Sequence, residues 1–497
     1  MPTSQTINGL SMSYVFTFDF GSEEILDLSS AKLKQGLETF TSTYYFLGEG
    51  KQIEIGSSEH LLLKAYKKEI YELRFKQAGL VQRKSLILQL DPIELDGLTY
   101  NSVEVVRNKI RLDTTVQIHE MGVGSVVFWL DLEGKENFQT EGLSGFGDTA
   151  NLRTKVNWSG GSNKELRIDG IFSIEELARF VIICLNSIFF DDSLRASDVE
   201  NRTLTNVVKK MLADNKTLEY VHSFICQETT RNMILVHEQI DSYPIFHFNF
   251  KNKTDADINF INTFVENNKK QIRGLVAKDK NWDKKTDQIV DEFLKTSSFS
   301  TRESIKWFTH NTGSLKIYSH EIETDVLTSK VLITFELELV LTMKHYVYKI
   351  IRNLDYFTNL SKEELPLRAL AKFRNREMRR LDEYYNLDFL QKDTTRNRID
   401  RFKVILNVED VLQIALKKLE SLNLFLNTEH QFASQRRQTI ISTVFGIFGA
   451  GNLANAFLIH LIKDRNFVIP LGWHVFNVLM SMLVIGVIIF FITNNKK

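Results

Sequence analysis

The sequence predicts an α+β cytosolic domain followed by a long stalk helix and two transmembrane helices. The first half of the 497-residue chain contains short runs in which apolar and polar residues alternate, as they do in β-strands. A heptad pattern of apolar residues begins at Ile405, which is typical of a long helix that packs along a narrow seam. Two uncharged apolar runs near the C-terminus are each long enough to cross a bilayer.

The composition limits the classes of partner. The chain has 62 basic and 62 acidic residues, so its net charge predicts neither direct nucleic-acid binding nor an enzyme for acidic substrates. Its two cysteines, Cys184 and Cys226, belong to no CxxC pair, which indicates a reducing compartment without a zinc site or a disulfide framework. The start, MPTSQTINGL, lacks the features of a signal peptide, so we expect most of the chain to lie in the cytosol.

Residues 1–250 are expected to form a mixed, strand-rich cytosolic domain. MSYVFTFDF alternates aromatic residues at every second position, and TTVQIHEMGVGSVVFWLDL is typical of two strands around a turn at Gly122 and Gly124. The GVGS of that turn could be a phosphate loop, but a hairpin turn fits the flanking strands better. NMILVHE and IFHFNF are typical of further strands, and Ser173 with Glu176 forms a capping box that opens an apolar helix.

Residues 251–398 are expected to form a mainly helical cytosolic region. Helices are predicted from Asn252 to Thr296 and again from Thr324, with a hairpin in ESIKWFTHNTGSLKIYS between them. A basic stretch follows, and it could bind an anion such as a nucleotide phosphate or a lipid headgroup. The alternative is a solvated face paired with nearby acidic residues. The ligand-binding candidates are Arg374, Arg376, Arg379 and Arg380.

A long stalk helix is predicted over residues 399–438. Apolar residues recur there in alternating steps of three and four, and neither proline nor glycine interrupts the pattern between Ile399 and Phe445. We expect the seam to pack against copies of the same chain, and the alternative is that it packs against the chain's own domain. The seam comprises Ile405, Val408, Leu412, Ala415, Leu419, Leu422 and Leu426.

Two transmembrane helices are predicted at 439–462 and 473–492, with an external loop at 463–472 and a basic cytosolic tail at 493–497. Basic residues flank the outer ends of this pair of helices, so the positive-inside rule favours cytosolic N- and C-termini. The expected localisation is therefore the cell inner membrane, in a multi-pass arrangement. The alternative is a buried helical hairpin.

The first apolar run has a face of small and polar side chains. Such faces let helices approach closely, and their hydroxyls find partners on other helices or in a water-filled lumen. Two asparagines lie on roughly the opposite side of the helix. Tight packing of the glycines is the alternative to a pore or a hinge. The pore or hinge candidates are Thr439, Ser442, Thr443, Gly446, Gly449, Gly451, Asn452 and Asn455.

The segment RQTIISTVF, Arg437 to Phe445, is similar to the start of the first membrane span in the CorA family of divalent-cation channels. The order of a large cytosolic region, a long helix, a span, a short loop, a second span and a basic tail also resembles that family. The resemblance implies a homopentamer whose first spans line a pore, gated by an α/β cytosolic funnel. It covers the C-terminal part of the chain.

Two features depart from the family pattern. The family's Gly-Met-Asn triplet would fall at Ala456, Phe457 and Leu458 and is absent, and its acidic external loop is replaced by KDRNF, which has a net positive charge. Both departures weigh against magnesium selectivity. Divergent relatives without the triplet occur beside type III CRISPR systems, where they resemble membrane effectors that answer to a nucleotide signal.

Three functional hypotheses follow from these observations. The first is a CorA-like channel in antiviral defence, gated through the cytosolic domain by a small anionic or nucleotide ligand. The second is a divalent-cation transporter of the magnesium type, and the third is a non-conducting, membrane-anchored binding protein. The expected partners are the lipid bilayer and further copies of the chain, and the transported ion is not identified. We expect no catalytic residues, cofactor or metal site, because the eleven histidines are scattered and none forms HExxH.

Overall fold

The computed structural model describes residues 6–7, 9–19, 43–48, 51–55, 85–119, 123–132, 138–160, 166–189, 241–250, 258–300, 305–318, 323–359, 371–375, 377–378, 381 and 393–463. The chain divides into two compact units. The first comprises Met1–Tyr356 and Glu377–Leu416, and the second comprises Phe357–Arg376 and Lys417–Lys497.

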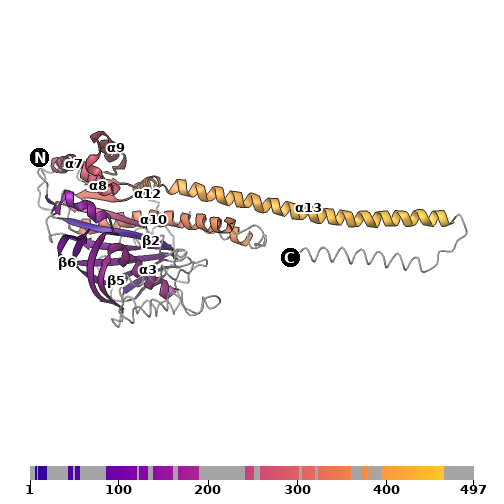
Figure 1. The fold of residues 1–497 in the computed structure, drawn as a ribbon, viewed down its shortest axis with the longest axis horizontal. Coiled ribbons are helices and arrows are strands. Elements are labelled where there is room, and N and C mark those ends of the chain that lie inside the picture. Colours follow the sequence, from indigo (N-terminus) through magenta and orange to yellow (C-terminus); the bar gives the residue numbers. More distant parts are fainter. Residues whose placement is uncertain are drawn as a thin grey trace. The chain divides into compact units, whose positions relative to one another are not determined.

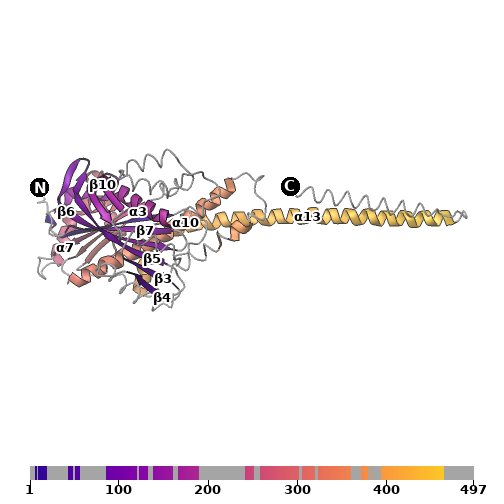
Figure 2. The same ribbon diagram turned by 90° about the horizontal axis from the view of Figure 1, so that it is seen from below.

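A large mixed sheet forms the centre of the first unit (Figures 1 and 2). Nine strands follow one another in the order β10-β9-β5-β6-β7-β2-β11-β13-β12, and β3 pairs with β5 and with β4. Neighbouring strands are antiparallel, except that β11 and β13 are parallel. The strands are β2 (Leu10–Asp19), β3 (Thr43–Gly48), β4 (Lys51–Ile55), β5 (Ser85–Tyr100), β6 (Val103–His119), β7 (Val123–Asp131), β9 (Leu152–Gly160), β10 (Leu166–Ser173), β11 (Asp241–Asn249), β12 (Ile305–Thr309) and β13 (Ser314–Tyr318). A separate antiparallel pair is formed by β1 (Thr6–Ile7) and β8 (Phe138–Gln139).

The predicted strands that fall on described residues are confirmed. MSYVFTFDF lies mostly in β2, IFHFNF lies mostly in β11, and the predicted hairpin over ESIKWFTHNTGSLKIYS is the antiparallel pair of β12 and β13. The second predicted hairpin is β6 and β7, and Gly124 lies inside β7 opposite Phe18. A Cβ at Gly124 would come within 2.7 Å of the Phe18 ring, so this glycine allows close packing. Gly122 and NMILVHE lie outside the described residues.

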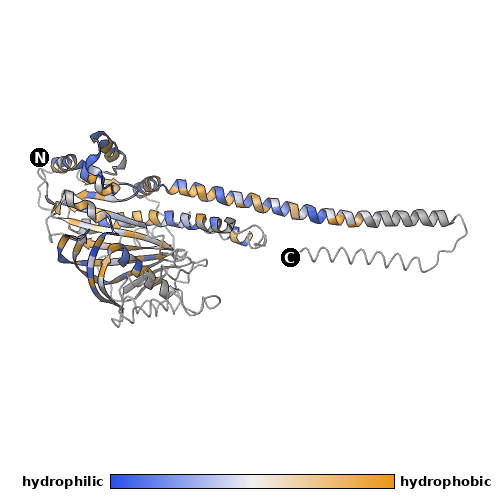
Figure 3. Ribbon diagram, viewed as in Figure 1, coloured by the Kyte–Doolittle hydropathy of each residue, from blue (hydrophilic) through white to orange (hydrophobic). Residues whose placement is uncertain are grey.

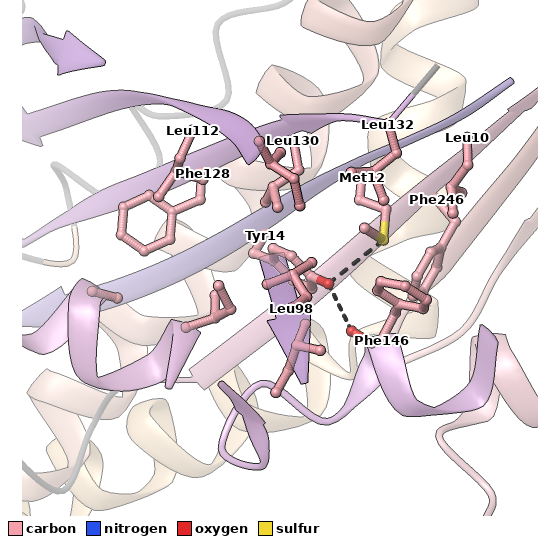
Figure 4. Close-up of a cluster of buried hydrophobic side chains, with 14 of the residues drawn as sticks. Leu10, Met12, Tyr14, Leu98, Leu112, Phe128, Leu130, Leu132, Phe146 and Phe246 are labelled. Carbon is pink, nitrogen blue, oxygen red and sulfur yellow. Dashed lines mark hydrogen bonds between the residues drawn. The ribbon is translucent and has the colours of Figure 1, made fainter. Parts of the chain in front are cut away.

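An apolar core covers one face of the sheet (Figure 4). The even-numbered residues of β2, from Met12 to Phe18, point into it because side chains alternate along a strand. The hydroxyl of Tyr14 donates to the carbonyl oxygen of Phe146 at 2.8 Å, so this buried polar group is satisfied. The core is covered by the 3₁₀-helix η2 (Thr140–Gly147) and by α3 (Ile174–Phe189), α7 (Ile258–Asn267) and α8 (Lys269–Ala277), which all contribute buried apolar side chains to it.

The predicted capping box at the start of α3 is confirmed. The N–H of Ser173 donates to Glu176 Oε2 at 2.7 Å, and the N–H of Glu176 donates to Ser173 Oγ at 3.1 Å. These reciprocal bonds satisfy two backbone donors that the first helical turn would leave unpaired. The strand β10 therefore ends at Ser173 and α3 begins at the next residue.

The remaining described elements are mainly helical, as predicted from Asn252 onward. They are the 3₁₀-helix η5 (Trp282–Lys284), α9 (Asp287–Ser297), α10 (Glu323–Asn359), α12 (Asp393–Ile405) and α13 (Val408–Lys463). The long helix begins later than the predicted stalk over 399–438. Asn407 adopts a left-handed conformation with φ 56°, which asparagine tolerates better than most residues, so the chain turns between α12 and α13.

The apolar seam of the predicted stalk is buried within the chain. Ile405 is half-buried, and the six seam residues that follow it are buried: Val408, Leu412, Ala415, Leu419, Leu422 and Leu426. This burial favours the alternative in which the seam packs against the chain itself. A second copy of the chain would therefore have to use other faces of α13.

The membrane part of the predicted fold class is corrected by the structure. In the described part of the chain, no helix has a segment long and apolar enough to cross a membrane. Residues 439–462, predicted as the first span, belong to α13. Before this stretch, polar and apolar residues alternate along the helix (Figure 3). The two-transmembrane, CorA-like architecture and the multi-pass inner-membrane localisation are therefore not supported, and the homopentamer stays a prediction. The predicted loop after Lys463, the second span at 473–492 and the tail at 493–497 lie outside the described residues.

Candidate functional site

The second face of the sheet is buried but polar. In β2, the residues that alternate with the aromatic side chains are Ser11, Ser13, Val15 and Thr17, and they point away from the apolar core. The strand registers place polar residues of the neighbouring strands on the same face. We call this surface the polar layer, and its buried polar members are Ser11, Ser13, Thr17, Gln89, Thr115, Gln117, His119, Ser125, His247, Asn249, Thr309, Ser314 and Lys316.

Helix α10 covers the polar layer with polar side chains of its own. Ser13 Oγ lies 3.2 Å from Thr334 Oγ1, the Ser125 hydroxyl donates to Glu338 Oε1, and Thr17 Oγ1 lies 3.4 Å from His345 Nδ1. The three helix residues are separated by four and seven positions, so they share one face of α10. The helix is therefore attached to β2 and β7 by hydrogen bonds between side chains.

Glu338 is a buried carboxyl that changes its charge near neutral pH. Its side chain is 3% exposed and accepts the hydrogen bond from Ser125. Burial raises the pKa of Glu338 from 4.5 to about 7, and the bond from Ser125 acts in the opposite direction. The charge of the polar layer at this point therefore depends on pH in the physiological range.

A second buried carboxyl joins α10 to α12. Glu336 is 0% exposed, and Arg398 donates to both of its oxygens, from Nε at 2.9 Å and from Nη2 at 2.6 Å. This is the paired geometry in which a guanidinium binds a carboxylate most strongly. Loss of one partner from such a pair leaves an uncompensated buried charge, so the pair fixes α12 relative to α10.

Aromatic contacts also hold α12 in place. Phe402 stacks on Phe299 with ring centroids 4.9 Å apart, and Arg401 lies over the same ring at 4.0 Å. Arg401 also donates from Nη2 to the carbonyl oxygen of Ser298 at 2.8 Å. The last two turns of α12 are therefore attached both to α10 and to the segment that follows α9.

At its β11–β13 end, the polar layer brings basic and aromatic side chains together. The parallel register places His247 opposite Lys316 and Asn249 opposite Tyr318. His247 Nδ1 lies 3.2 Å from the Tyr318 hydroxyl, and Lys316 Nζ lies 4.4 Å from the centre of the Tyr318 ring. Burial holds the pKa of His247 well below its usual range, and the charges of Lys330, on α10, and of Lys316 add to this effect.

The predicted arginine site is described at one of its four residues. Arg374 donates from Nη1 to Asn423 Oδ1 at 3.2 Å, within the second unit, and it also contacts Asn375. Arg376, Arg379 and Arg380 lie outside the described residues. The anion site at these four arginines stays a prediction.

The predicted pore or hinge residues all lie along α13. Thr439, Ser442, Thr443 and Gly446 are exposed, and Thr443 Oγ1 donates to the carbonyl oxygen of Thr439 at 2.7 Å, a bond within the helix. A Cβ at Gly446 or at Gly449 would meet no atom within 4 Å. The helical backbone continues through Gly451, Asn452 and Asn455. A pore or hinge role for these residues stays a prediction.

Comparison with known protein families, with curated proteins and with solved structures found no match to this chain. The resemblance to the CorA family therefore stays a prediction from the sequence. Among the residues that the structure describes, no group of three or more His, Cys, Asp and Glu side chains could hold a metal ion.

Sequence reasoning missed the polar layer. The alternation of serine and threonine with aromatic residues in β2 is the normal signature of a strand with one solvent-exposed face. The useful signal lay in α10, where Glu336, Glu338, His345 and Lys349 interrupt an otherwise apolar helix. A helix with charged residues on more than one side and few exposed positions is a candidate for a buried polar interface.

Proposed function

We propose that this chain is a binding protein whose β-sheet domain controls the self-association of helix α13. The observation that carries the proposal is the buried ion pair between Glu336 and Arg398. It joins α10, which covers the polar layer, to α12, and only Leu406 and Asn407 separate α12 from α13. A change in the polar layer that moves α10 therefore has a direct route to the start of α13.

Helix α13 has the features of a helix that requires a partner. It has 56 residues, which corresponds to about 84 Å at 1.5 Å per residue. Beyond Leu426 its described side chains are mostly exposed, and they include Ile441 at 53% and Phe445 at 72%. Isolated helices in water gain little stability without packing of an apolar face, and exposed apolar side chains favour association.

The shape of α13 supports a second copy of this chain as that partner. Around residue 440, bulky apolar side chains occupy one side of the helix and small ones occupy the other. In parallel copies, the bulky side of one helix can pack against the small side of the next, which is a head-to-tail contact of the kind that forms rings when the rotation closes. The bulky side comprises Ile440, Ile441, Val444 and Phe445, and the small side comprises Thr439, Ser442, Thr443 and Gly446.

This proposal keeps one part of the functional hypotheses drawn from the sequence, namely an oligomer controlled by its globular domain. The channel, transporter and membrane-anchored hypotheses stay predictions from the sequence. A small anionic or nucleotide ligand remains compatible with the proposal.

Self-association is tested by sedimentation equilibrium of the full chain over a range of concentrations. We expect the wild-type chain to form an oligomer, and Phe445→Asp to weaken it by at least about tenfold in dissociation constant. Val404→Asp is the matched control, because Val404 on α12 is similarly exposed at 68% and lies outside α13. A monomeric wild-type chain, or equal effects of the two variants, would contradict the proposal.

Control by the sheet domain is tested with Arg398→Met, which breaks the pair with Glu336. We expect the dissociation constant to change by about tenfold or more. Arg396→Met is the matched control, because Arg396 lies on the same helix in an exposed pair with Asp400 at 4.0 Å. Arg398→Lys keeps the charge without the paired hydrogen bonds. This variant is measured instead if circular dichroism shows that the methionine variant does not fold. An unchanged constant in a folded Arg398 variant would show that the domain does not control association.

A further inference from the structure

Helix α10 carries two buried carboxyls that have different kinds of partner. Glu336 is paired with the guanidinium of Arg398, which offsets its charge. Glu338 is 3% exposed and accepts a hydrogen bond from the neutral hydroxyl of Ser125, and in the described part of the chain no cation is paired with it. A buried carboxylate without a cation is costly, so this position favours the protonated carboxyl.

These two carboxyls lie on opposite sides of α10. Residues two positions apart in a helix are separated by about 200° around its axis. Glu338 contacts β7 on the side of the sheet, whereas Glu336 contacts Arg398 of α12 on the other side. A shift of α10 relative to β7 therefore acts on the pair with Arg398 directly.

Other titratable groups occupy positions around Glu338. Its partner Ser125 lies opposite Thr17 of β2 and Gln117 of β6. Among the described residues, the raised pKa of Glu338 has two causes, which are burial and, in the opposite direction, the hydrogen bond from Ser125. The titratable residues at neighbouring positions are Asp19 of β2, His119 of β6, Asp241 of β11 and His345 of α10, and Asp131 of β7 and Lys349 of α10 lie further along.

We propose that the contact between Glu338 and the sheet is a pH-dependent switch, in which protonation holds α10 on β7 and ionisation loosens α10 and changes the self-association of α13. The chemical step is the loss of one proton from the carboxyl to water. This inference rests on the proposed function, because the effect reaches α13 through Arg398 and α12.

The linkage between proton binding and this contact sets the sign and the size of the effect. The pKa of Glu338 is about 7 when α10 is attached, and it returns to the ordinary value of 4.5 when the contact loosens. The stabilisation is therefore fully present below about pH 4.5 and is lost as the pH rises through 7. Between pH 6 and pH 8, the equilibrium constant for loosening should rise by about tenfold.

Hydrogen–deuterium exchange of the full chain at pH 6 and pH 8 tests the switch. After correction for the intrinsic exchange rate, we expect the protection of α10 amides to fall by about tenfold at pH 8 in the wild-type chain and to be unchanged in Glu338→Gln. His345→Gln is the matched control and should retain the fall, because His345 is titratable and contacts Thr17 from the same face of α10. Unchanged protection in the wild-type chain, or a fall that persists in Glu338→Gln, would overturn the proposal.

Sedimentation equilibrium at the same two pH values tests the link to self-association. We expect the dissociation constant of the wild-type chain to change by about tenfold, in the same direction as Arg398→Met changes it, and that of Glu338→Gln to stay constant. A change below about twofold, while the protection of α10 falls, would overturn the proposal. A chain that is monomeric at both pH values contradicts the proposed function instead, and the exchange measurement then decides whether the Glu338 contact depends on pH.

Discussion

Substitution of Glu338 by glutamine should remove a pH dependence of stability that the wild-type chain shows. The folded-state pKa of about 7 lies above the ordinary value of 4.5, so the protonated carboxyl stabilises the fold below about pH 4.5. This contribution is lost as the pH rises through 7. At about 1.4 kcal/mol for a tenfold change in proton affinity, the loss between pH 5 and pH 8 is on the order of 3 kcal/mol. Glutamine keeps the shape and the hydrogen bond to Ser125 without a titrating group.

The measurement is urea unfolding of both chains at pH 5 and pH 8, followed by circular dichroism. The free energy of unfolding of Glu338→Gln, relative to wild type, should rise by about 3 kcal/mol from the lower to the higher pH. Glu336→Gln is the matched control, because Glu336 is equally buried but paired with Arg398, and its replacement should destabilise the fold at both pH values. A difference for Glu338→Gln that does not change with pH would refute the reasoning.

Two further substitutions test the packing around the sheet. Ser173→Ala removes one bond of the capping box of α3 and should cost about 1 kcal/mol, measured as a fall in the urea midpoint at unchanged slope, and Ser173→Asp should retain most of the stability. Gly274→Ala places a Cβ 2.6 Å from Trp282 Cγ and should cost about 1–3 kcal/mol. The double variant with Trp282→Ala should lose less than the sum of the single costs, and strict additivity would refute this contact.

Local elements were predicted well from the sequence because local chemistry determines them. The strand β2 follows from its alternating aromatic residues, and the start of α3 follows from Ser173 and Glu176. The long helix was placed less well. Its heptad pattern continues without proline or glycine, but Asn407 adopts a left-handed conformation. The spacing of apolar residues does not predict such a turn. A single residue with a permissive backbone was enough to divide the predicted stalk into two helices.

The candidate site could not be predicted because it depends on tertiary burial. Ser13, Thr17 and Ser125 have the spacing of solvent-facing residues, and only the position of α10 makes them buried. The same holds for Glu336, whose partner Arg398 lies 62 positions away in the sequence. A sequence pattern reports which residues share a face, but it does not report what covers that face.

The two faces of the sheet provide an internal comparison that bears on function. On one face, α3, α7 and α8 pack against the sheet mainly through an apolar core. On the other face, α10 is attached through hydroxyls, a carboxyl with a raised pKa and a histidine. Replacement of buried ionic groups by apolar side chains is often neutral or stabilising, so stability alone does not explain the polar layer. An attachment whose strength depends on protonation is adjustable, whereas an apolar attachment is not. The polar layer is therefore the part of the fold where we expect this protein to receive its signal.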